Sequence, residues 1–169
     1  MIYPVVKYGQ RVLETPAEPI TVFNGDLEKL VADMFETMYA ANGVGLAATQ
    51  IGIGKRLTVI DITSGQDPKA KLVLANPVII ATDGRLSQDE GCLSLPDLRA
   101  QTPRPARATV CAQDLTGKEF TMEGEGLLAR AFCHETDHLN GVLFINHLSL
   151  LKRESIKRKV KKLMKAGDW

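Results

Sequence analysis

The amino-acid sequence predicts an α+β domain in which antiparallel or mixed β-sheets surround a central helix, with one helix near each end of the chain. Three observations indicate this fold class. Apolar residues recur with helical spacing in three segments, the middle of the chain is rich in β-branched residues, and strands and helices do not alternate in a βαβ series. With 169 residues, no internal repeat and no linker, we expect one domain over residues 1–169.

The first predicted helix covers about Asp26 to Asn42. Its apolar residues follow the i, i+3, i+4, i+7 pattern of one buried face. They are Leu27, Leu30, Val31, Met34, Phe35, Met38 and Tyr39. Asp26 is a suitable N-cap, and Gly43 can adopt the left-handed conformation that ends a helix. A glycine-rich stretch, residues 43–52, follows.

The middle of the chain predicts β-strands. Residues 57–62 and 72–80 are rich in aliphatic and β-branched side chains. Residues 107–113 and 118–123 flank a short connection, 114–117, which contains a glycine and is typical of a hairpin. Pro96, Pro103 and Pro105 lie between Cys92 and this hairpin, so we expect a loop or an irregular edge strand there.

Two further helices are expected in the last third of the chain. In the segment from about Glu125 to Asn140, one helix face carries Leu127, Ala131, His134 and His138, and Gly141 supplies the stop. The last helix covers residues 150–165 and follows Ser149. It belongs to a strongly basic segment, since eight Lys/Arg and two acidic residues occur from Leu150 onward. The first 149 residues have a net charge of −5.

Composition and charge exclude several classes of protein. The chain is 44% hydrophobic and 24% charged, which is typical of a folded domain, and its net charge of +1 creates no global attraction to nucleic acid or membrane. No apolar run is long enough for a transmembrane helix, and charged residues interrupt the first twenty positions, where a signal peptide would be apolar. We therefore expect a cytoplasmic protein. Three cysteines do not make a disulfide framework.

The pattern His134-Glu135-Thr136-Asp137-His138 is the main chemical signal. Two histidines four residues apart on a helix project from one face and can bind one metal ion. Glu135 can reach a water molecule on that ion, as the general base of a metal-dependent hydrolase does. The alternative is a helix that carries two histidines by chance.

A catalytic site of this kind needs a third protein ligand and one open position. The extended zinc-protease pattern is H-E-x-x-H-x-x-G-x-x-H, in which Gly141 fits but Phe144 occupies the place of the last histidine. Glu154 lies among basic residues and resembles a solvated helix charge. His147 lies beyond the helix stop, where a surface or capping role is expected.

The cysteines offer another third ligand. Cys133 adjoins His134, so its side chain is rotated about 100° away on the helix and should not reach the same ion. Cys111 lies in a predicted hairpin strand, where packing is the expected role. Cys92 remains, in the sequence Glu90-Gly91-Cys92-Leu93-Ser94, where the glycine allows close approach of the backbone.

Three segments in this order resemble one known family. Residues 43–50 resemble a G-x-G-L-A-A-x-Q motif, residues 90–94 an E-G-C-L-S motif, and residues 134–138 an H-E-x-D-H motif. Together they are similar to those of peptide deformylase, and the resemblance spans nearly the whole chain. It implies an enzyme that removes the formyl group from the N-terminal formyl-methionine of newly synthesised proteins and releases formate.

The resemblance also implies the roles of individual residues. The implied metal ligands are Cys92, His134 and His138. Glu135 would be the acid/base residue, and the Gln50 side chain and the Leu93 backbone N–H would stabilise the oxyanion. One departure is Cys133, where the family often has glutamine; this position is not a ligand, so we expect an effect only on packing or on the groups that surround a metal ligand.

Further residues are candidates for binding the peptide. Gly43 and Gly45 would let a substrate backbone pair as an added strand, although a helix stop and a turn explain them equally well. Val44, Leu127 and Ala131 would line an apolar pocket for the methionine side chain, or belong to an ordinary core.

Glu90 and Arg99 are candidates for contacts with a metal ligand or the substrate backbone, with a surface ion pair as the alternative. Asp137 is a further candidate for ordering the surroundings of the metal.

The metal and the partners are less closely determined by the residues. A site with two histidines and one cysteine suits iron, zinc, nickel or cobalt, and the resemblance implies Fe²⁺, with Zn²⁺, Ni²⁺ or Co²⁺ as substitutes. We expect nascent formyl-Met peptides as substrates and a monomer in solution. The basic helix 150–165 suggests contact with the ribosome. The alternative is a solvated helix that packs inward through Ile156, Val160, Leu163 and Met164.

Two rival hypotheses share the same motif. One is a peptidase that uses the H-E-x-x-H chemistry on unblocked or internal peptide bonds. The other is a metal-stabilised binding protein without catalysis, which Glu135 and Gln50 argue against because a structural site needs neither.

Overall fold

A computed structural model describes residues 1–169 and confirms the α+β fold class. A five-stranded sheet has the strand order β1-β2-β3-β6-β7, and every neighbouring pair is antiparallel. Its strands are β1 (Gly45–Ala47), β2 (Leu57–Ile60), β3 (Leu72–Asp83), β6 (Arg107–Gln113) and β7 (Glu119–Glu125). The predicted strands and the hairpin at 114–117 are therefore confirmed, while the short strand β1 inside the glycine-rich stretch was missed.

Strands β4 (Leu86–Cys92) and β5 (Leu95–Arg104) form a separate two-stranded sheet, hereafter the ribbon. The sequence predicted either a loop or an irregular edge strand between Cys92 and the hairpin. The second alternative is confirmed, because β4 and β5 pair with a register shift at Gly91/Cys92. Both strands of a two-stranded sheet are edge strands. Pro96 and Pro103 are tolerated there because one side of each strand needs no donor.

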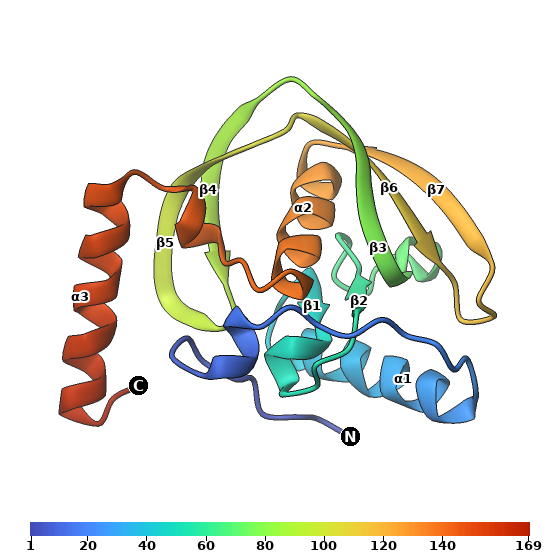
Figure 1. Ribbon diagram of the computed structural model, residues 1–169, viewed down its shortest axis with the longest axis horizontal. Helices are drawn as coiled ribbons and strands as arrows, with labels where there is room; N and C mark the ends of the chain where they lie inside the picture. The colour runs from blue at the N-terminus through green and yellow to red at the C-terminus, as the bar shows by residue number, and fades with distance from the viewer.

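Helix α2 (Leu127–Leu139) lies at the centre of the molecule, between the ribbon and the β3–β6–β7 part of the large sheet (Figure 1). Ala131 and Phe132 are buried against Ile60, Leu74 and Val110 of the sheet. The helix begins two residues later than predicted, because β7 continues to Glu125. The connections β3–β4 and β5–β6 arch over the start of the helix (Figure 1).

Helix α1 (Gly25–Ala40) packs its apolar face against β1 and β2. Two details of the prediction are wrong. The N-cap is Asn24 and not Asp26. Asn24 directly precedes the first helical residue, and its side chain accepts a hydrogen bond from Leu27 N–H, one of the amides that the first turn leaves without a backbone partner. The left-handed residue after the helix is Asn42 (φ 58°) and not Gly43, since asparagine also tolerates that conformation.

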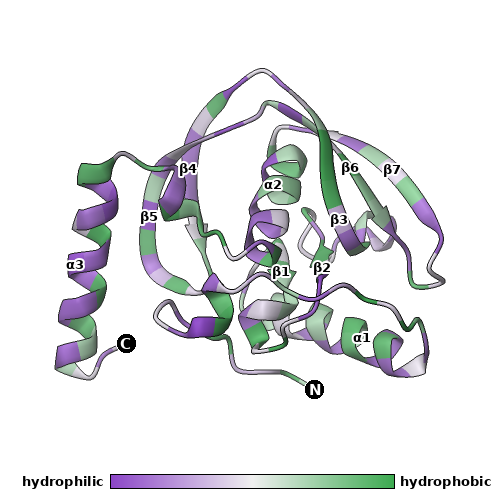
Figure 2. Cartoon of the chain, viewed as in Figure 1, coloured by the Kyte–Doolittle hydropathy of each residue, from purple (hydrophilic) through white to green (hydrophobic).

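Helix α3 (Leu150–Ala166) follows Ser149, as predicted, and Ser149 is its N-cap, whose side chain accepts a hydrogen bond from Lys152 N–H. Ile156 and Val160 are buried against the ribbon residue Leu95, as expected. Met164, which the alternative to ribosome contact placed on the inward face, is 44% exposed, so that alternative is not correct for this residue. Hydrophilic and hydrophobic residues alternate along the helix (Figure 2). No helix combines the length and the apolar character that crossing a membrane requires.

A buried aspartate holds the glycine-rich stretch near the helix. The backbone N–H of Asp61 donates to Val44 O (2.9 Å). Its carboxylate accepts hydrogen bonds from the Tyr39 hydroxyl, from Thr63 and from Gly65 N–H. Burial alone would raise the pKa of Asp61, but the hydrogen bonds from Thr63 and Tyr39 outweigh burial and lower it.

We predict that Asp61→Asn destabilises the protein by about 1–3 kcal/mol near neutral pH, because an amide cannot accept all these bonds. A lowered folded pKa stabilises the protein above the unfolded value of about 3.9 and loses this effect as pH falls toward the folded value. The difference from wild type should therefore shrink in acid. Urea unfolding across pH measures it, with exposed Asp83→Asn as the control. Equal stabilities at neutral pH would contradict the prediction.

Candidate active site

The three predicted metal ligands lie together between α2 and the turn of the ribbon. Cys92 Sγ lies 3.3 Å from His138 Nε2, and the two histidine Nε2 atoms are 3.1 Å apart. One ligand atom from each residue lies within 4.8 Å of the others. The histidines come from successive turns of α2, and Cys92 ends β4 at the register shift. Burial, and to a lesser extent repulsion from the neighbouring His134, hold the pKa of His138 well below its usual range. This imidazole therefore stays neutral.

This donor set fits a metal ion. Zinc-type bonds of about 2.0–2.3 Å place two ligands of one tetrahedral ion roughly 3.3–3.6 Å apart, close to the spacing of these atoms. One thiolate and two imidazoles are the ligands that iron, zinc, nickel and cobalt accept. Cys92, His134 and His138 are therefore suited to a divalent ion, as the sequence predicted.

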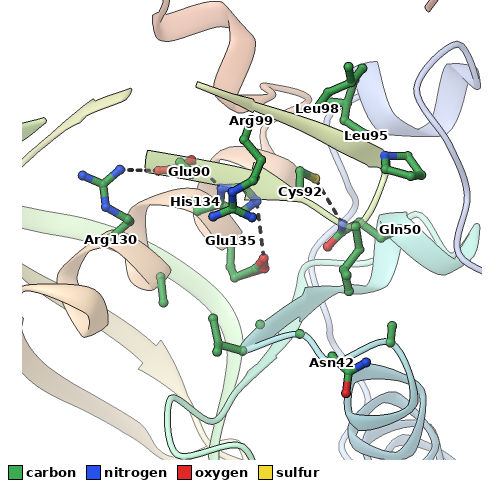
Figure 3. A pocket seen from close by; sticks show the side chains of 18 of the residues that line it. Asn42, Gln50, Glu90, Cys92, Leu95, Leu98, Arg99, Arg130, His134 and Glu135 are labelled. Atoms are coloured by element: carbon green, nitrogen blue, oxygen red, sulfur yellow. Dashed lines mark hydrogen bonds and ion pairs between the residues drawn. The ribbon is translucent and has the colours of Figure 1, made fainter. Parts of the chain in front are cut away.

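Glu90 holds His134 in the orientation that metal binding needs. Its carboxylate is buried and accepts from His134 Nδ1 at 2.7 Å, which leaves Nε2 facing Cys92 and His138. Two arginines, Arg104 and Arg130, also donate to it. Figure 3 shows the contact of Arg130. Burial opposes ionisation of Glu90, but the hydrogen bonds from His134 and Arg104 prevail and the pKa is well below the usual range.

Sequence reasoning missed both arginines. Arg130 precedes His134 by four residues on α2, a spacing that puts the two side chains on one helix face and could have revealed it. Arg104 is at the end of β5, beside the prolines, and no local pattern marks it. It also donates to Asp137, which His147 contacts at 2.7 Å. His147 thus lies outside the metal cluster, as expected.

Glu135 is the buried carboxylate beside the ligands, with only 2% of its surface exposed. Burial raises its pKa to about 7. One carboxylate oxygen lies 4.0 Å from His134 Nε2, and the other has no hydrogen-bond partner in the protein. A carboxyl group with this pKa can both accept and return a proton near neutral pH.

Gly45 makes room for that carboxylate. A side-chain Cβ built at Gly45 would lie 2.9 Å from Glu135 Cδ and 3.0 Å from Cγ, closer than real contacts of this kind. At Gly43 the added carbon would lie 2.8 Å from Leu93 Cδ1. The two glycines therefore allow Glu135 and Leu93 to approach the backbone. A helix stop or a turn alone would not require glycine at these positions for this reason.

Gln50 reaches the ligands from the 3₁₀-helix η2 (Ala48–Ile51). Its Oε1 accepts a hydrogen bond from Ala47 N–H at 3.0 Å, which fixes the orientation of the amide. The amide nitrogen Nε2 therefore faces Cys92 Sγ (3.5 Å) and Ser94 Oγ (3.2 Å), as Figure 3 shows for Cys92. Leu93 and Ser94 form the turn between β4 and β5, so Leu93 lies next to the ligand Cys92. Ser94 was not predicted.

A cleft of about 620 Å³ opens onto these groups. Its lining includes every predicted catalytic and substrate residue, and two of the three ligands: Gly43, Val44, Gly45, Gln50, Glu90, Cys92, Leu93, Arg99, Leu127, Ala131, His134 and Glu135. Leu127 is half exposed and Ala131 is buried, so they offer an apolar wall. Arg99 pairs with Asp89 on the surface, its side chain 59% exposed, and its guanidinium also lies against Gly91.

The remaining candidates lie where the sequence predicted or nearby. Glu154 is exposed on α3. Cys133 is buried against Ala108 and Ala129, away from the cleft. The expected packing role of Cys111 is only partly correct, because its half-buried thiol contacts Glu119 Oε1 at 2.9 Å.

Comparison with known proteins agrees with this geometry. A family model described as polypeptide deformylase matches residues 2–154. The chain belongs to the peptide deformylase family. The peptide deformylase of Acidobacterium capsulatum is 56% identical over 169 residues, which cover 100% of this chain and 99% of that protein. The relative from Thermodesulfovibrio yellowstonii is 47% identical over 160 residues, 95% of this chain and 97% of that protein.

The fold of the family is also the fold of this chain. The crystal structure of a peptide deformylase from Legionella pneumophila superposes with a TM-score of 0.91 at 43% identity, covering 99% of this chain and 98% of that one. The chain is therefore an enzyme that removes the N-terminal formyl group from nascent proteins, and it belongs to a family of metalloenzymes. The rival hypotheses of a peptidase and of a metal-stabilised binding protein are wrong.

We predict that Gly45→Ala lowers kcat by about 10–100-fold, because the new methyl group displaces the Glu135 carboxylate and misplacement by about 1 Å costs about 10²-fold. Formate release from formyl-Met-Ala measures it. Gly54→Ala is the matched control, since a Cβ there meets nothing within 4 Å. Wild-type kcat in Gly45→Ala would show that Glu135 does not need this space.

Proposed function

We propose that Cys92, His134 and His138 hold one divalent metal ion, that Glu135 is the acid/base residue, and that Gln50 and the Leu93 backbone N–H stabilise the oxyanion. The observation that carries this proposal is the convergence of a thiol, two imidazoles and a buried, unpartnered carboxylate at the end of one cleft. When bound, the ion supplies a Lewis acid and activates water near neutral pH.

The cleft would bind the formyl-Met end of the peptide. Gly43 and Gly45 would let the substrate backbone lie close to the rim, and Val44, Leu127 and Ala131 would contact the methionine side chain. Arg99 at the opposite rim would contact the substrate backbone further along. Glu90 acts indirectly, because it is buried behind His134 and bonded to it.

Glu135 moves the proton in this scheme. It accepts a proton as water attacks the formyl carbon, and it returns one to the methionine nitrogen as the carbon–nitrogen bond breaks and formate leaves. Its pKa of about 7, raised by burial, suits both transfers. Negative charge develops on the formyl oxygen, where the Gln50 amide and the Leu93 N–H would each donate a hydrogen bond. One such donor is typically worth ~3 kcal/mol.

We propose Fe²⁺ as the metal in the cell, with Zn²⁺, Ni²⁺ or Co²⁺ able to replace it. All four accept sulfur and nitrogen ligands, and zinc binds such sites more tightly than ferrous iron. Availability during synthesis, and not affinity, would therefore decide which ion is loaded.

Several wider features complete the proposal. We infer that residues 1–169 form a single catalytic domain that acts as a monomer in the cytoplasm, where nascent chains emerge. We also propose that α3 contacts the ribosome, because its exposed residues are mostly lysine and arginine and ribosomal RNA is anionic.

We predict that Glu135→Gln lowers kcat for formyl-Met-Ala by about 10²–10⁴-fold, the usual range for a lost acid/base group, with KM little changed. Glu123→Gln, an exposed carboxylate on β7, is the matched control and should be fully active. A glutamine variant within a few-fold of wild type would exclude Glu135 as the proton carrier.

Metal content provides a separate prediction. Protein purified without oxygen should carry one iron per chain. Cys92→Ala should reduce metal affinity by more than about 100-fold, which exceeds the loss expected when only a hydrogen-bond partner of a ligand is removed. Cys111→Ser is the control, because Cys111 lies outside the cluster. If the fully active native protein contained zinc, the proposal of Fe²⁺ as the metal in the cell would be wrong. If Cys92→Ala kept full metal occupancy, Cys92 would not be a metal ligand.

Ribosome contact is tested with charge reversal, since α3 also buries Ile156 and Val160 and its removal would expose the core. Lys159, Lys161 and Lys162 are exposed. Changing all three to glutamate should abolish co-sedimentation with ribosomes while formate release stays at the wild-type rate. Unchanged co-sedimentation in low salt would remove α3 as the contact.

A further inference from the structure

The two proposed oxyanion donors come from segments with separate supports. Gln50 is on η2, which follows β1 of the large sheet, whereas Leu93 is in the turn of the ribbon. The ribbon pairs with no strand of the large sheet. The distance between the two donors is therefore not fixed by any sheet hydrogen bonds, although both must contact one oxygen atom within a few tenths of an ångström.

The segment Val6–Tyr8, which leads into a turn at Tyr8 and Gly9, connects these two supports through its backbone. Val6 N–H donates to Gln50 O at 2.7 Å, and Tyr8 N–H donates to Ser94 O at 2.8 Å. The segment thus sets the spacing between the backbone of Gln50 and the residue that follows Leu93.

Trp169 holds the same segment through the carbonyl of Tyr8. Its indole Nε1–H donates to Tyr8 O at 2.8 Å, and Lys7 Nζ lies 5.9 Å from the centre of its ring. The ring also packs against the cluster formed by Leu95 and Val160, which joins the ribbon to α3. Tyr8 is therefore hydrogen-bonded through both its N–H and its carbonyl, to Ser94 and to Trp169 respectively.

We propose that Trp169 is a positioning residue for the oxyanion site, acting through Tyr8 and the Val6–Tyr8 segment on Gln50 and Leu93. This inference rests on the proposed roles of Gln50 and Leu93. Loss of the indole frees the Tyr8 carbonyl and loosens the segment, so the two donors vary in separation. The cleft that binds the peptide contains neither Trp169 nor Tyr8, so substrate affinity is unaffected.

The test is a double-mutant cycle of Trp169→Ala and Gln50→Ala, assayed by formate release from formyl-Met-Ala with the metal-loaded enzyme. We expect Trp169→Ala to lower kcat about tenfold, less than the 10²–10³-fold effect of removing a donor outright, with KM within about twofold of wild type. In the Gln50→Ala background the same change should have much less effect, because one of the two positioned donors is already absent.

Two further variants separate positioning from stability. Trp169→Phe retains the packing of the ring but lacks the N–H donor, so it should fold and give a smaller loss of kcat. Leu151→Ala truncates an exposed apolar side chain on α3, the helix that precedes Trp169, and should match wild type. If Trp169→Ala does not fold, the cycle is run with Trp169→Phe.

The outcomes distinguish this inference from the proposed function. Unchanged kcat in folded Trp169 variants, or equal losses in the wild-type and Gln50→Ala backgrounds, would overturn the positioning role. Full activity of Gln50→Ala alone would overturn the role of Gln50 and, with it, the basis of the inference. Loss of activity in Gln50→Ala together with full activity in both Trp169 variants would overturn the inference only.

Discussion

The buried carboxylate of Glu90 is the interaction on which the arrangement of the active site depends. A buried charge is costly unless it is paired and hydrogen-bonded, and here Arg104, Arg130 and His134 all donate to it. These partners come from β5 and α2, while Glu90 itself is on β4. One ionic cluster therefore joins the ribbon to the central helix and sets the orientation of a metal ligand.

The cluster also explains why both the ribbon and the helix are required. The ribbon has no strand neighbour in the large sheet, so side-chain interactions hold it against α2. Arg104 contributes twice, through Glu90 and through Asp137, which precedes the ligand His138. Any movement of the ribbon would carry Cys92 away from the histidines and leave charged groups unpaired in the interior.

Local patterns predicted the helices and most of the site, because their signals are short in sequence. The spacing of His134 and His138 fixes their common face, and Ser149 and Gly141 mark helix boundaries through ordinary capping chemistry. The ribbon was harder to predict. Its prolines argue against strands, and it was the pairing of β4 with β5, a tertiary event, that decided the structure.

The parts that sequence could not predict depend on contacts between distant segments. Arg104 approaches Glu90 only after the ribbon forms, and nothing in its sequence neighbourhood indicates a buried role. The space that Gly45 leaves for Glu135 likewise appears only when β1 lies beside α2. Asn42 shows the limit of a residue preference, since it adopts the left-handed conformation that was assigned to the adjacent glycine.

The division of the metal ligands between a helix and a turn has a consequence for the order of events during folding. His134 and His138 need only one helix turn to come together, whereas Cys92 lies 46 positions before His138 in the chain. Closing so long a loop occurs after local helix formation. Before the ribbon docks, only the two imidazoles can lie together. If these residues hold the ion as proposed, tight binding would therefore coincide with docking of the ribbon.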